Sequence, residues 1–192
     1  MKKRIMAMLL TFFICLMMLP PKDSASALVF TPNCTVTSEA AVLLNMDIGE
    51  IVYEKNADMK EFPAALAQVM TAVIVLENCP KISEEKITAK AELFAPLANY
   101  ENQTDLRYAE IDAEDTLTVE DLLYAMMLTS SCEASLMLAD HFGGGSEEAF
   151  VEKMNAKAVE LGMTATRFTN ATGLYSARQV TTARDMMTLL KY

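Results

Sequence analysis

The sequence predicts an α+β fold, in which an N-terminal β-hairpin precedes a block of helices. Ala40–Asn45 is almost entirely apolar, which is typical of a buried strand. Asp47-Ile48-Gly49 is a turn signal, and Ile51–Glu54 follows it as the expected hairpin partner. Farther along the chain, apolar residues recur at helical spacing between capping residues. Strands gathered at one end and helices at the other favour the α+β class.

The middle of the chain predicts one long helix and little other regular structure. Pro63 stands just before a helical stretch, Ala64–Leu76, that is apolar on most sides and therefore suits a central, buried helix. Lys86–Thr88 predicts a short strand. From Leu93 to Glu114 no period is visible, so we expect irregular surface structure there.

Four helices are expected after this region. Thr118 is a good N-cap for the first, and Asp121 three residues later nearly completes a capping box. The other helices are each bounded by residues that start or stop helices: Glu133–Phe142 before three glycines, Glu147–Leu161 between Ser146 and Gly162, and Thr182–Tyr192 after Thr181.

The N-terminus has the pattern of a secretory signal peptide. Met1–Arg4 is positively charged, and the apolar run Ile5–Leu19 is too short for a membrane-spanning helix, which needs roughly 20 residues. Ala25-Ser26-Ala27 supplies the small residues that a signal peptidase recognises. We therefore expect residues 1–27 to be removed and residues 28–192 to act outside the cytoplasmic membrane. An uncleaved membrane anchor is the alternative.

Composition excludes several classes of partner. The predicted mature chain carries 12 basic against 25 acidic side chains, a net charge of −13. Such a chain should bind neither nucleic acid nor an anionic membrane surface by charge, so membrane contact is expected only through the signal peptide. There is no C-x-x-C pair, and the single histidine, His141, lies in a helical stretch. We therefore predict no zinc site and no cofactor.

Three cysteines remain in the predicted mature chain. Cys34 and Cys79 both lie beside turn-forming residues, and an exported chain can keep a disulfide, so they are the candidate pair. Cys132 would then be left over.

Four stretches, in this order and with these gaps, resemble the serine-type D-alanyl-D-alanine carboxypeptidases. These enzymes (peptidase family S11) are low-molecular-weight penicillin-binding proteins of bacterial cell-wall metabolism. The stretches are Ala41–Lys55, Pro63–Ala72, Leu117–Asp140 and Phe150–Asp185. The resemblance implies a β-lactamase/transpeptidase-like fold and a domain at residues 28–192 that corresponds to about the first half of the family's catalytic domain. The later strands of the sheet would then be absent.

The resemblance also implies a chemistry, in which a Ser of an S-x-x-K motif attacks the peptide carbonyl and the Lys takes its proton. Residues i and i+3 share a helix face, so the two side chains meet. Here the nucleophile position holds Ala65 and the base position holds Gln68. The S-x-N motif keeps its serine as Ser130 but has Cys132 in place of asparagine, and no K-T-G motif occurs. The chain is therefore expected to be a pseudoenzyme that could still bind peptidoglycan stem peptides.

Two alternatives stay open. The chain could be a non-functional fragment of a longer gene, marginally stable unless a protein partner completes the sheet. It could instead be a residual serine-type or cysteine-based peptidase, with Cys132 as the nucleophile and His141, Arg107 or Lys55 near it. A buried, inert Cys132 thiol is the simpler interpretation, and core packing is the expected role of Thr71.

Overall fold

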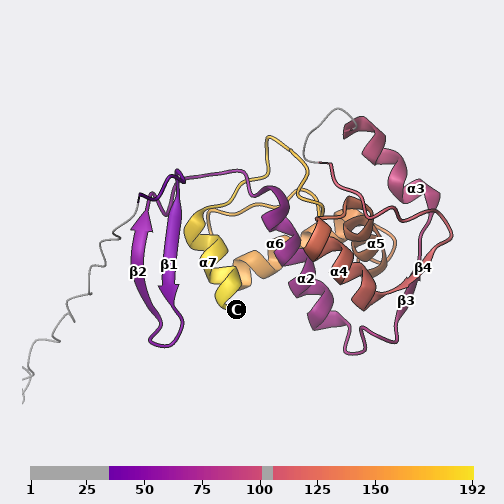
Figure 1. Ribbon diagram of the computed structural model, residues 1–192, viewed down its shortest axis with the longest axis horizontal. Helices are drawn as coiled ribbons and strands as arrows, with labels where there is room; N and C mark the ends of the chain where they lie inside the picture. Colours follow the sequence, from indigo (N-terminus) through magenta and orange to yellow (C-terminus); the bar gives the residue numbers. More distant parts are fainter. Residues whose placement is uncertain (1–34, 101–105) are drawn as a thin grey trace, which may run out of the picture.

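The computed structural model describes residues 35–100 and 106–192 of the 192-residue chain (Figure 1). The predicted signal peptide and Cys34 lie outside the described residues. Within these two ranges, no helix combines the length and the apolar character needed to cross a membrane.

The hairpin forms where the sequence predicts it, but it is not buried. Strand β1 (Ala41–Asn45) pairs antiparallel with β2 (Glu50–Lys55), and the turn between them uses Gly49 at a φ of +71°. The two strands form a two-stranded sheet at one end of the molecule, beside helix α7 (Ala183–Lys191) (Figure 1). Leu43 is 50% exposed because α7 covers only part of the hairpin. The predicted strands are confirmed, whereas the predicted burial of the first strand is wrong.

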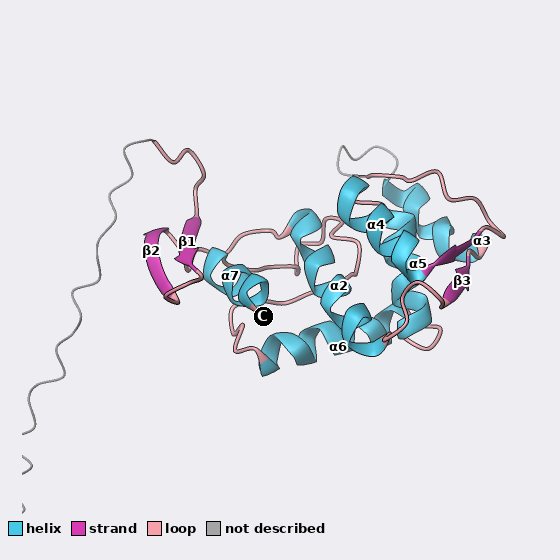
Figure 2. Cartoon of the chain, turned by 60° about the horizontal axis from the view of Figure 1, so that its bottom comes forward, coloured by secondary structure: helices cyan, strands magenta, loops and turns pink. Residues whose placement is uncertain are grey.

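The long central helix begins later than expected. A 3-10 turn, η1 (Ala64–Leu66), precedes α2 (Ala67–Asn78). Ala64 takes a positive φ of 47°, which a regular helix cannot contain, and this delays the α-helix. Figure 2 shows α2 in the middle of the molecule, and it contacts α4, α5, α6 and α7. Its buried residues, among them Met70, Ile74 and Val75, form the centre of the main core.

The segment expected to be irregular contains regular structure. Helix α3 (Ala91–Phe94) runs into the 3-10 helix η2 (Ala95–Tyr100). Outside this segment, the predicted short strand is confirmed as β3 (Lys86–Thr88), which pairs with β4 (Thr116–Thr118) in a second small sheet. Leu97 is buried in a small apolar cluster with Cys132, Leu136 and Leu174. The ordering of this segment therefore comes from tertiary packing, which leaves no period in the sequence.

Each of the remaining helices begins at a capping residue. They are α4 (Val119–Thr129), α5 (Cys132–Phe142), α6 (Glu147–Glu160) and α7. The predicted capping box of Thr118 and Asp121 is confirmed, and so is the Ser146 cap. The cap of α7 is Thr182 and not Thr181, because the Thr181 backbone is already paired with Glu61.

A partly buried carboxyl group on α6 holds the segment 168–174. The Glu147 Oε1 atom accepts the Ala171 N–H at 3.1 Å, and the Thr71 hydroxyl donates to the Ala171 carbonyl at 2.9 Å. Thr71 is thus buried, as expected, but it also carries a hydrogen bond. Burial raises the pKa of Glu147 above its ordinary value.

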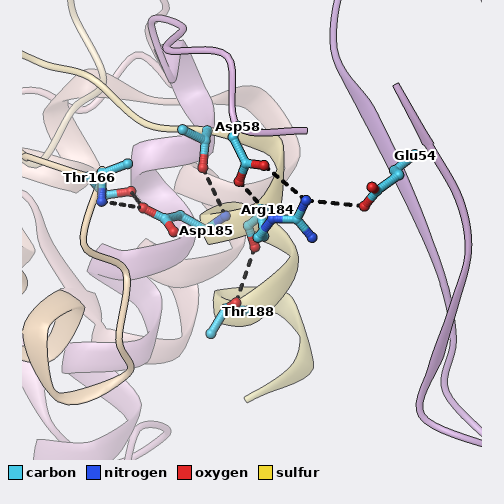
Figure 3. Close-up of polar contacts among 8 residues, drawn as sticks. Glu54, Asp58, Thr166, Arg184, Asp185 and Thr188 are labelled. Atoms are coloured by element: carbon cyan, nitrogen blue, oxygen red, sulfur yellow. Dashed lines mark hydrogen bonds and ion pairs between the residues drawn. The ribbon is translucent and has the colours of Figure 1, made fainter. Parts of the chain in front are cut away.

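Arg184 links α7 to the hairpin and to the loop that follows it (Figure 3). Its Nε atom lies 2.6 Å from Asp58 Oδ1, and its Nη2 atom lies 3.0 Å from Asp58 Oδ2 and 3.1 Å from Glu54 Oε2. The next residue, Asp185, faces the other way and accepts from the Ala165 N–H and the Thr166 hydroxyl. Two adjacent residues of α7 therefore tie the hairpin region to the helical block.

We expect Arg184→Ala to loosen the hairpin without unfolding the helical core. Removing the guanidinium breaks the contacts to Asp58 and Glu54, which are screened by salt because they are largely exposed. Amide hydrogen exchange in β1 and β2 should accelerate severalfold, while α5 stays protected. Arg178→Ala is the matched control, because Arg178 takes part in no ion pair of the described residues. Equal exchange in the two variants would contradict the role of Arg184.

We expect Glu147→Gln to stabilise the chain at neutral pH but not in acid. Because the pKa of Glu147 is raised in the folded state, its carboxyl favours folding most when it is protonated, and this contribution is lost as the pH rises through the raised pKa. Glutamine keeps an oxygen acceptor for the Ala171 N–H and has no charge to bury. The Tm at pH 7 should rise by a few degrees, and the difference should vanish below the ordinary carboxyl pKa of 4.5. A lower Tm at pH 7 would refute this account.

Candidate functional site

A pocket of about 200 Å³ brings together three of the residues predicted from the motifs. Ala65 comes from η1, Gln68 from the first turn of α2 and Ser130 from the end of α4. The other lining residues are Ala64, Arg107, Thr172, Gly173 and Leu174. Segments more than 100 positions apart in the sequence therefore meet at the Ala65 pocket, as we name this cavity.

The Gln68 side chain connects the segments that form the pocket wall. The side chain is only 3% exposed, and its Nε2 atom lies 3.0 Å from the Thr172 carbonyl, 3.2 Å from the Ser130 carbonyl and 3.3 Å from Ser135 Oγ. The amide thus donates toward three acceptors from three segments. Within the described residues no buried side-chain nitrogen or oxygen lacks a partner, so this amide is a satisfied part of the structure.

Ser130 lies at a sharp change of direction between two helices. It is the C-cap of α4 in the left-handed region, with φ 58° and ψ 34°, and Ser131 then caps α5 by accepting the Ala134 N–H. The Ser131 hydroxyl donates to Glu133, whose carboxylate also accepts the N–H groups of Ala109 and Ile111. Glu133 therefore fixes the segment that carries Arg107 beside the pocket.

The opposite wall depends on a close approach between two backbones. Gly173 has a φ of +81°, and a Cβ atom added there would lie 2.3 Å from the Ala64 carbonyl oxygen. Any larger residue would push the 168–174 segment away from Ala65. Sequence reasoning did not single out Thr172, Gly173 or the pocket position of Arg107. The only signal for the first two is the Phe168–Leu174 stretch that carries the family resemblance.

Cys132 does not reach the Ala65 pocket. Its side chain is 2% exposed and packs in the apolar cluster with Leu97, Leu136 and Leu174. Burial raises the pKa of the Cys132 thiol, which disfavours the nucleophilic thiolate. His141 is bound elsewhere, with Nε2 2.6 Å from Glu85 Oε1. Cys132 is therefore not among the residues that line the pocket, and the described hydrogen bond of His141 goes to Glu85.

The predicted disulfide between Cys34 and Cys79 stays a prediction, since Cys34 is outside the described residues. Cys79 is buried, and its Sγ atom donates to Glu85 Oε2 at 3.1 Å. Burial is the main cause that raises the pKa of this thiol. Among residues 35–100 and 106–192, no cluster of three or more His, Cys, Asp or Glu side chains could hold a metal ion.

The lining of the Ala65 pocket sets what it can do chemically. Its lining residues include Ser130, which carries a hydroxyl, Ala65, whose side chain is a methyl group, and Arg107, whose Nη1 atom also donates to the Leu106 carbonyl at 3.0 Å. The hydroxyl and the guanidinium can donate hydrogen bonds to a bound peptide. Gln68 is already engaged with the protein and has no basic nitrogen, so it cannot activate a nucleophile.

Comparison with known proteins agrees with this arrangement. The D-alanyl-D-alanine carboxypeptidase family model matches residues 25–192. The chain is 30% identical over 191 residues to D-alanyl-D-alanine carboxypeptidase DacF of Bacillus subtilis, covering 98% of this chain and 47% of that protein. It is 32% identical over 173 residues to a D-alanyl-D-alanine carboxypeptidase of a Streptomyces species, covering 85% of this chain and 58% of the relative.

The fold is shared with solved structures as well. Penicillin binding protein 5 from Haemophilus influenzae superimposes with a TM-score of 0.72 at 28% identity, covering 84% of this chain and 46% of that one. The chain thus spans about half the length of the curated relatives it matches. The α+β architecture is that of the transpeptidase-like fold, and the chain belongs to the D-alanyl-D-alanine carboxypeptidase family.

Proposed function

We propose that this chain is a catalytically inactive member of its family that binds peptidoglycan stem peptides ending in D-alanyl-D-alanine. The observation that carries the proposal is the Ala65 pocket, in which a methyl group occupies the nucleophile position while Gln68 and Ser130 remain beside it. A methyl group cannot attack a carbonyl carbon, and an amide nitrogen cannot act as the base that an S-x-x-K serine needs.

The residues that line the pocket are better suited to binding a peptide than to cleaving it. The pocket's guanidinium, on Arg107, has the fork geometry that pairs with a peptide's terminal carboxylate, and the Ser130 hydroxyl can donate to a peptide carbonyl. Such a cation stands out in a chain with a net charge of −10. The hydrogen bonds of Gln68 hold the wall in place without a ligand.

The proposal includes export across the cytoplasmic membrane. Residues 1–27 carry the charged, apolar and small-residue regions of a signal peptide, and the substrates named for the family's members belong to the cell wall. A chain that binds stem peptides would have to meet them on the outer side of that membrane.

A protein partner that adds a strand to the hairpin is a further part of the proposal. The sheet of β1 and β2 has two strands; the apolar side chain of Leu43 is exposed on β1, and those of Met46 and Ile48 are exposed in the turn between the strands. Unpaired strand edges with apolar side chains are favourable sites for an added strand.

Cysteine-based peptidase chemistry is the candidate from another class. The burial of Cys132, its raised pKa and its absence from the lining of the Ala65 pocket all argue against it. The non-functional fragment is the other alternative, and it differs from the proposal by predicting no specific binding.

The proposal predicts binding without hydrolysis. An N-acylated peptide ending in D-Ala-D-Ala should bind the purified chain in calorimetry, and no free D-alanine should be released on prolonged incubation. Ala65→Phe should abolish binding because its ring would fill a cavity of only about 200 Å³. Leu66→Phe is the matched control, since the adjacent Leu66 is half exposed and does not line the pocket.

Two results would overturn the proposal. Release of D-alanine by the unaltered chain would show that a nucleophile is present. Binding that is absent, or that Ala65→Phe and Leu66→Phe weaken equally, would favour the non-functional fragment.

A further inference from the structure

A second cavity, of about 280 Å³, lies apart from the Ala65 pocket and shares none of its lining residues. One wall is the N-terminal half of α6, which contributes Glu147, Glu148 and Glu152. The other wall comes from the chain segments around Phe168 and Arg178, which contribute Arg167 and Arg178. Acidic groups thus come from the helix, and basic groups come from the segments that face it.

The two walls are held rigidly. Asn155 on α6 accepts the Phe168 N–H and donates to the Phe168 carbonyl, both at 2.9 Å. The Arg167 N–H and carbonyl are paired with Val180 at 2.8 and 3.0 Å. Glu147 is fixed by its bond to the Ala171 N–H. The cavity is therefore preformed, so a ligand would not have to order its walls.

The opposite charges around this cavity are not joined to one another. Within the described part of the chain, no hydrogen bond or ion pair connects the guanidinium of Arg167 or Arg178 to a carboxylate. Arg184, by contrast, binds two carboxylates directly. In the described residues, Arg167 and Arg178 thus line the same cavity as the glutamates of α6 without a direct bond to their carboxylates.

We propose that this cavity binds a small zwitterion, a free amino acid or dipeptide. The ligand's carboxylate pairs with Arg167 and Arg178, and its ammonium group pairs with Glu148 and Glu152, which lie one helical turn apart on one face of α6. The three glutamates would repel a purely anionic ligand, and the two arginines would repel a purely cationic one. The volume falls just below the roughly 300–1,000 Å³ of typical ligand pockets, which limits the ligand to a few heavy atoms beyond one amino acid.

This inference goes beyond the proposed function, because it concerns a different cavity and a ligand with a free amino group. The stem peptides proposed for the Ala65 pocket are N-acylated, so the two ligand classes can be tested separately.

The test is an NMR titration of the full chain with L-alanyl-L-alanine. Shifts should centre on the amides of Glu148, Glu152 and Arg167. The N-acetylated dipeptide, which lacks the ammonium group, and the dipeptide amide, which lacks the carboxylate, should each bind roughly tenfold more weakly or worse, since each loses charge-assisted hydrogen bonds.

Substitutions distinguish the cavity from the Ala65 pocket. The double variant Arg167→Gln/Arg178→Gln should bind the zwitterionic dipeptide about tenfold more weakly or worse. The variant should keep its fold, because both arginine side chains are exposed. Ala65→Phe should leave this binding unchanged.

Three results would overturn the inference: no binding up to the solubility of the dipeptide, equal binding of its three charge forms, or loss of binding in Ala65→Phe but not in the double arginine variant. None of these bears on the N-acylated peptide, so the proposed function would stand or fall separately.

Discussion

One buried amide nitrogen holds the Ala65 pocket together. Gln68 Nε2 lies within hydrogen-bond distance of acceptors at the end of α4, on α5 and in the 168–174 segment, so one side chain joins three segments around the pocket. The family's lysine would bring a charged ammonium to this position, and a buried charge costs far more than a buried amide unless it is paired. Glutamine keeps donors for these carbonyls without that charge. A glutamine at this position therefore suits a folded pocket wall.

The hairpin and the later helices could be predicted from sequence because their signals are local. The turn at Gly49, the capping box of Thr118 and the Ser146 cap each involve residues that are only a few positions apart in the sequence. Burial of the first strand could not be predicted in the same way. It depends on what covers the hairpin, and an apolar strand has the same sequence whether or not its face is covered. The 3-10 helix η2 was missed for the converse reason, since its Leu97 is buried by residues that are distant in the sequence.

The candidate site likewise contains residues that local sequence patterns predict and residues that only the tertiary structure places there. Ala65, Gln68 and Ser130 follow from motif spacing, and the structure brings them together. Arg107 and Gly173 reach the pocket through the path of their loops, which no short pattern encodes. Cys132 stands two residues from Ser130, but the left-handed turn at Ser130 and the start of α5 send its side chain into an apolar cluster. The burial expected for this thiol in the simpler interpretation is therefore confirmed.

The central claim is that the Ala65 pocket contains no working nucleophile. A β-lactam tests it directly, because acylation of any nucleophile in the pocket leaves a covalent adduct. We predict that the intact mass of the purified chain is unchanged after incubation with excess benzylpenicillin. A stable increase in mass by one penicillin, mapped to a residue of the pocket or to Cys132, would contradict the account.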